Sequence, residues 1–274
     1  MQLSRTENAM YWTSTSAPQK KSGEIFNALI KLARTRHEID SFTLRRAKQD
    51  AESLLPVDAA GAHLVLGVIA CLENDVDELH RRHRLAINLA PVRHQAIAHY
   101  GVSLARLSLF DEAIPQLEAV VELVPEDKTA LATLITMSFR AGRLRAADRW
   151  LTVWDQRCPG QKHELESLIR TTLEFARYHE ITDDDLATSI REAVRLILVR
   201  KVPQGTWEGG LFADDDDIWI SYRLRVYAEP NEVAELCEAL ADRYAAMELN
   251  ATVATRYSVG YGVEPPEVAS GGNA

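Results

Sequence analysis

The chain of 274 residues carries 31 Lys and Arg against 40 Asp and Glu, which gives a formal net charge of −9. Hydrophobic residues make up 46% of it, so extensive disorder is excluded and there is enough apolar material for one large or two smaller cores. No run approaches the roughly 20 apolar residues that span a bilayer. Three widely separated cysteines argue against a disulfide framework, and we expect a cytoplasmic protein with no membrane contact.

Residues 1–23 lack the apolar stretch of a signal peptide, and we expect a flexible segment there. From residue 24 to residue 201, apolar residues recur at helical spacing, which predicts one helical domain. Its first two helices are expected at Ile25–Arg36 and Ser41–Leu55.

A repeat with a period of 34 residues follows. Pro91, Pro125 and Pro159 are separated by 34 residues each, and Gly67 and Gly101 keep the same spacing. Proline ends one unit and begins the next helix with a fixed φ, while glycine in the first helix lets the second helix approach closely. Such units cannot bury their apolar faces alone, so a period of this kind predicts a stacked array of helix pairs.

These residues resemble the tetratricopeptide repeat (TPR) family, whose units contain a large apolar residue and glycine, then small residues, then proline. The best match is residues 94–127, with Tyr100-Gly101, Ala113, Leu117 and Pro125. Residues 60–93 and 128–161 match less fully, and Ile135 stands where glycine is usual. The resemblance covers roughly residues 25–200 and implies a helix-turn-helix superhelix.

Two further helices are predicted downstream, at Gln161–His179 and Thr182–Lys201. Thr182 followed by three aspartates is typical of a helix start, because carboxylates complement the helix dipole. We expect these two helices to form a pair that caps the array.

In the TPR family, positions two, five, nine and twelve of the first helix face a concave groove. Carried over to this sequence, the resemblance places nine residues in a peptide-binding groove: Leu64, Val68, Cys71, Gln95, Ala98, Val102, Ala105, Thr136 and Phe139. The Lys, Arg and Asn with which some members hold a C-terminal carboxylate are absent. A small apolar groove suits a hydrophobic helix or an extended peptide of a partner. The alternative is that an N-terminal or C-terminal segment of the chain itself fills it.

Residues 202–264 predict a second, small α+β module. Alternating patterns indicate strands at Thr206–Phe212, Ile218–Tyr227 and Ala251–Tyr261, with a helix after Glu229 between the last two, so the order is β-β-α-β. Residues 265–274 are expected to be a flexible tail. Residues 202–274 hold 4 basic and 13 acidic side chains, which accounts for the whole net charge of −9 and makes nucleic acid an improbable partner of this module. The predicted fold class is therefore mainly α, with a TPR-like superhelix followed by this module.

One face of the predicted sheet gathers arginine and aromatic residues. They lie opposite the helix and form a possible face for an anion or a partner: Trp219, Arg223, Arg225, Tyr227 and Arg256. Guanidinium groups bind carboxylates and phosphates through paired hydrogen bonds. The alternatives are that Asp214–Asp217 and nearby glutamates pair with these arginines, or that the face packs on the helical array.

The chain lacks the nucleophile, phosphate-loop and zinc motifs that carry common chemistries. Asp214–Asp217 lacks the spacing of a calcium loop, and His80 and His83 lie among arginines that disfavour a metal, so no cofactor or metal is expected. The sequence favours a non-catalytic, chaperone-like bacterial scaffold or adaptor that binds a protein or peptide, with homo-oligomerisation left open. Two alternatives remain: an effector or enzyme module regulated by the array, and an acidic, antitoxin-like binder of a basic partner.

Overall fold

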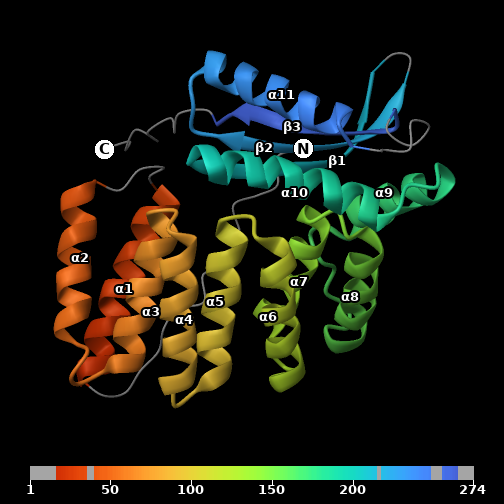
Figure 1. The fold of residues 1–274 in the computed structure, drawn as a ribbon. Helices are drawn as coiled ribbons and strands as arrows, with labels where there is room; N and C mark the ends of the chain where they lie inside the picture. Colours follow the sequence, from red (N-terminus) through yellow and green to blue (C-terminus); the bar gives the residue numbers. More distant parts are fainter. Residues whose placement is uncertain (1–16, 36–39, 215–216, 248–254, 265–274) are drawn as a thin grey trace, which may run out of the picture.

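The computed structural model describes residues 17–35, 40–214, 217–247 and 255–264. The chain is mainly helical and ends in a small α+β module, as predicted (Figure 1). The helices before the module are α1 (Ala17–Thr35), α2 (Ser41–Ser53), α3 (Ala59–Leu72), α4 (Val76–Leu89), α5 (Arg93–Arg106), α6 (Phe110–Leu123), α7 (Lys128–Arg140), α8 (Leu144–Arg157), α9 (Glu166–Tyr178) and α10 (Asp183–Arg200).

The 34-residue period of the sequence appears as repeated helix pairs. Helices α4, α6 and α8 have 14 residues each and begin 34 residues apart. The turns that precede them place Asn74, Ser108 and Gly142 at positive φ values of 55°, 57° and 70°. A left-handed residue at the same position of each unit ends one helix and reverses the chain, so α3–α4, α5–α6 and α7–α8 stack side by side.

The first helix begins earlier than the sequence pattern predicted. Helix α1 begins at Ala17, so residues 17–23 are helical, and the predicted flexible segment and the helix start at Ile25 need correction. Ser22 is buried, and its hydroxyl donates to Asp58 Oδ2 over 2.6 Å at the start of α3. Because the buried residue at this point is the polar Ser22, the sequence there does not show the apolar spacing by which the helix start was predicted. Residues 1–16 lie outside the described part.

Helix α10 does not complete a capping pair with α9. It runs across the ends of the array, over the turns inside the repeats (Figure 1). At the α7–α8 turn, an added Cβ on Gly142 would lie 2.6 Å from Leu186 Cβ of α10. Asp183 accepts from the backbone N–H of Arg145 and from its guanidinium over 3.1 and 3.0 Å. The expectation that α9 and α10 cap the array as a pair is therefore wrong, because α10 packs against turns instead of against a neighbouring helix pair.

The C-terminal module has the predicted β-β-α-β order, with β1 (Gln204–Ala213), β2 (Ile218–Val226), α11 (Pro230–Ala245) and β3 (Tyr257–Val263). The sheet order is β1-β2-β3, with β1 antiparallel and β3 parallel to β2. The third strand was predicted from Ala251; residues 251–254 lie outside the described part, as does the predicted tail 265–274.

One face of this sheet is buried against α10, α11 and the array. The hydroxyl of Tyr261 donates to Ala193 O of α10 over 2.6 Å, and the hydroxyl of Tyr244 in α11 donates to Ser189 O over 2.9 Å. Tyr222 of β2 meets Phe139 of α7, with 5.7 Å between ring centroids. The buried residues form one continuous cluster from α5 to β3, so the change of secondary structure near residue 202 does not separate two cores.

Candidate protein-binding pocket at the rim of the array

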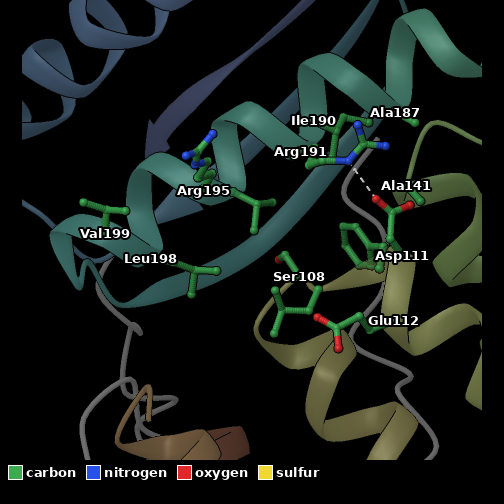
Figure 2. Close-up of a pocket in the computed structure, with 13 residues that line it drawn as sticks. Ser108, Asp111, Glu112, Ala141, Ala187, Ile190, Arg191, Arg195, Leu198 and Val199 are labelled. Carbon is green, nitrogen blue, oxygen red and sulfur yellow. Dashed lines mark hydrogen bonds and ion pairs between the residues drawn. The ribbon is translucent and has the colours of Figure 1, made fainter. Parts of the chain in front are cut away.

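A pocket of about 310 Å³ lies between α10 and the α5–α6 turn (Figure 2). We call it the rim pocket. Its walls are mostly apolar: Leu109 belongs to the turn, while Ile190, Val194, Leu198 and Val199 belong to α10. Val199 is 70% exposed, so apolar surface continues out of the pocket to solvent. This volume lies at the small end of the range for ligand-binding cavities, which suits one bulky apolar side chain.

The local sequence explains why α10 lies here. Thr182 and Asp185 form a capping box: the side chain of Thr182 accepts from the backbone N–H of Asp185, and the carboxylate of Asp185 accepts from the backbone N–H of Thr182. Eight residues of α10 are buried, on the side toward the sheet and on the side toward the array. A helix with two apolar sides needs two layers to cover it, and the rim pocket is the part of the second interface that stays open.

Ion pairs close one end of the rim pocket. Asp111 accepts from the guanidinium of Arg191 over 2.8 Å and also pairs with Arg143. Burial acts to raise the pKa of Asp111, but the hydrogen bonds from these two arginines outweigh it and hold the pKa below its ordinary value. The charged carboxylate of Asp111 therefore links the start of α6 to Arg191 of α10 by an ion pair.

The charged side chain of Arg195, also at the mouth, is less engaged. The side chain of Arg195 is 69% exposed, and its contact with Glu192 of the same helix measures 3.7 Å. Glu192 already receives a hydrogen bond of 2.8 Å from Arg243. A guanidinium group is therefore available beside the apolar opening, where it would favour a carboxylate on a bound segment.

The structure fills much of the predicted concave groove with the chain itself. Leu64 and Val68 pack in one cluster with Phe26 and Leu29 of α1, and Phe139 lies under Tyr222 of the sheet. Five of the nine groove residues are buried, namely Leu64, Val68, Cys71, Ala98 and Phe139. The other four are half-buried, namely Gln95, Val102, Ala105 and Thr136. Helix α1 therefore occupies the space at Leu64 and Val68, and the C-terminal module occupies it at Phe139, whereas Cys71 is buried by neighbouring helices of the array.

The structure brings only part of the predicted anion face together. Arg225 donates to Glu208 Oε1 over 2.8 Å, and Arg256 pairs with Asp217 over 2.5 Å, as the alternative interpretation expected. Arg223 is exposed on the same side of β2 as Arg225, and Trp219 is half-buried there. Tyr227 follows the end of β2 and lies half-buried.

The histidines of the first repeats are structural neighbours within the described residues. His83 is fully buried, stacks on Tyr100 with 5.3 Å between ring centroids, and lies 3.0 Å from Ser103 Oγ. The His83 ring fills the space left by Gly67, so this side chain belongs to the packing between α3, α4 and α5 and not to the exposed surface of α4. Across the described ranges, no group of three or more His, Cys, Asp or Glu is placed to hold a metal, and no helix is long and apolar enough to cross a membrane.

Sequence reasoning missed the rim pocket. The available indication was α10 itself, where Ala187, Ile190, Val194 and Leu198 recur at helical spacing along the side that lines the pocket. Comparison of the chain with protein-family models, curated proteins and solved structures found no match, so function has to be inferred from the geometry of these sites.

Proposed function

We propose that this protein is a non-catalytic, TPR-like adaptor that binds a segment of a partner protein in the rim pocket. The observation that carries the proposal is the exposed apolar opening formed by Leu109, Leu198 and Val199 between α10 and a repeated helix pair. Apolar patches rimmed by charge are typical of interaction sites. The partner would insert one bulky apolar side chain, and a carboxylate next to it would meet Arg195.

The proposed binding site lies at the rim of the array and not on its concave surface. At Leu64, Val68 and Phe139 a partner would have to displace α1 or the sheet, whereas the rim pocket is open in the folded chain. The free cysteines support a reducing compartment such as the cytoplasm: Cys71 and Cys158 are buried, and burial raises the pKa of the Cys71 thiol to about 11.

Site-specific photocrosslinking would test the proposal. A photoreactive amino acid at Val199 is expected to capture a partner protein in cells that express the chain naturally. The matched control is Val57, which is 65% exposed and lies before α3 at the other end of the array. Leu109→Asp should abolish the crosslink from position 199 while the far-ultraviolet circular dichroism stays unchanged. The proposal is wrong if positions 57 and 199 capture the same proteins, or if position 199 captures none.

A further inference from the structure

The outer edge of β3 has backbone N–H and C=O groups that could pair with another strand. Within the described residues β3 pairs only with β2, and it is the outer strand of the sheet beside α11 (Figure 1). At the opposite side of the sheet, β1 is approached by α9, where Leu168 lies against Gly210. The β1 edge of the sheet is therefore in contact with α9, whereas no described element pairs with the β3 edge.

The hydrogen-bond pattern shows which backbone groups of β3 face outward. Arg256 O accepts from Ile220 N over 3.0 Å, and Glu264 N donates to Val226 O over 2.9 Å, so even-numbered residues bond β2. Alternate residues of a parallel strand face opposite neighbours. The N–H and C=O groups of Tyr257, Val259, Tyr261 and Val263 are consequently directed to the outer edge. Val263 O already accepts from Arg225 and Tyr261 O from Cys237 Sγ, so an added strand would bond mainly the groups of Tyr257 and Val259.

The features that usually protect an edge strand are missing from β3. Natural edges carry lysine, proline or a bulge, which discourage pairing with another chain. Here the residues on the exposed face of β3 are Ser258, Gly260 and Gly262, and none of them is a lysine or a proline. The β2–β3 register is regular over all seven residues, so β3 has no bulge. Nothing in the strand itself opposes the addition of another strand.

Arg223 adds a charge to this edge. Its Cδ lies 2.9 Å from the place of a Cβ on Gly262, so the side chain leans from β2 over the glycines of β3. Neighbouring strands are about 4.8 Å apart, and an arginine side chain is long enough to cross one strand. The neighbouring Arg225 does cross, since its Nη1 donates to Val263 O over 2.9 Å. The Arg223 side chain is therefore long enough to bring its guanidinium to the position of an added strand.

The other face of the edge is flanked by α11. Cys237 Sγ lies 4.0 Å from Tyr261 O, one of the outward carbonyl groups, so this side of α11 flanks the edge. By helical spacing Ala234 and Ala241 lie on the same side of α11 as Cys237, with the exposed Glu238 next to them. The small side chains there would accept apolar side chains, whereas the Arg223 face would accept carboxylates.

We infer that β3 binds an extended acidic segment of a partner protein by strand addition, in which carboxylate side chains facing Arg223 alternate with apolar side chains facing α11. Backbone hydrogen bonds supply affinity in this mode, and alternate side chains supply specificity. A second copy of the chain fits less well. Pairing two β3 edges would bring two Arg223 guanidinium groups together, with only Ser258, Gly260 and Gly262 on that face and no carboxylate between them.

Titration calorimetry on the full chain would test this inference, with a short amidated peptide in which valine and glutamate alternate. Saturable binding is expected, and Arg223→Glu should weaken it at least about tenfold, because a charge-assisted hydrogen bond is lost. A peptide with lysine in place of glutamate should bind the Arg223→Glu protein better than the parent. Arg149→Glu, at an exposed position of α8, is the matched control and should bind like the parent.

N-methylation of the peptide separates strand addition from general charge attraction. Methyl groups on the alternate amides that face β3 should abolish binding, because these amides donate to the strand. Methyl groups on the amides in between, which face away from β3, should be tolerated. Equal tolerance of both, failure of the peptide to bind, or insensitivity to Arg223→Glu would overturn the inference. Val199→Asp should leave peptide binding unchanged, because a loss would place the peptide in the rim pocket. Dimerisation of the parent that Arg223→Glu disrupts would assign the edge to a second copy and would also contradict it.

Discussion

His83 and His99 stand out at the scale of single residues, because each ring is buried away from solvent in the first repeats. Burial lowers the pKa of His83 to about 3, with smaller contributions from His99 and His80, and it lowers the pKa of His99 to about 4. Both imidazoles are therefore neutral in the folded chain at every pH above about 5. His99 also contacts Phe26 of α1, with 4.7 Å between ring centroids.

The free energy of unfolding should fall as the pH drops below 6.5. The unfolded chain protonates these histidines near their ordinary pKa of about 6.5, whereas the folded chain does so only near 4 or 3, so acid favours unfolding. At pH 5 each histidine is expected to cost about 2 kcal/mol. Urea unfolding at pH 7 and pH 5 would measure this loss. In His99→Gln the loss should be smaller, and an unchanged pH dependence would contradict the assignment.

At the scale of elements, the sequence predicted the helices and strands well but not the packing of α10. Its apolar residues repeat at helical spacing, which also describes a helix inside an array. What differs is the partner: α10 meets the turns at Ser108 and Gly142, which are far away in sequence. A local pattern identifies a helix with an apolar side but does not say what covers it, and therefore the rim pocket was not predictable.

Gly142 provides a test of how closely α10 lies against the array. Its φ is +70°, and an added Cβ would meet Leu186 Cβ at 2.6 Å and Ile190 Cδ1 at 2.9 Å. Gly142→Ala should therefore lower the free energy of unfolding by about 2–4 kcal/mol, through backbone strain and overpacking. Gly160 is a matched control because its φ is +78° while no atom lies within 4 Å of the added Cβ. Gly160→Ala should show the backbone part alone, about 1 kcal/mol. Equal losses in urea denaturation would mean that α10 does not pack on this turn.

At the scale of the whole molecule, the C-terminal module and the array share buried surface. The indole of Trp207 donates to Ser108 Oγ over 2.8 Å, and its ring lies 5.8 Å from that of Phe110. Charge and secondary structure both change near residue 202, and from these the sequence predicted separate domains. The contacts that join the parts involve single aromatic residues, which leave no mark in composition or periodicity.

Calorimetry should accordingly show one cooperative unfolding transition for the full chain. Trp207, Tyr222 and Phe139 belong to one buried cluster, so neither part keeps its core when the other unfolds. A chain cut after Lys201 should expose Phe139 and Phe110 and unfold at lower urea concentration than the full chain. Two separated heat-absorption peaks, together with a folded 202–274 fragment, would instead establish the two predicted domains as independent.

The crossing of α10 over the turns also fixes the spacing of the two units that it contacts. Helix α10 has 18 residues, about 27 Å, and it contacts both the α5–α6 and the α7–α8 turns at fixed positions along its axis. In an open solenoid a unit can be gained or lost by duplication or deletion, because each unit touches only its neighbours. Here a unit inserted between α6 and α7 would move the α7–α8 turn away from its contact with α10. We therefore expect natural variants of this protein to differ in their loops but to keep these two units adjacent.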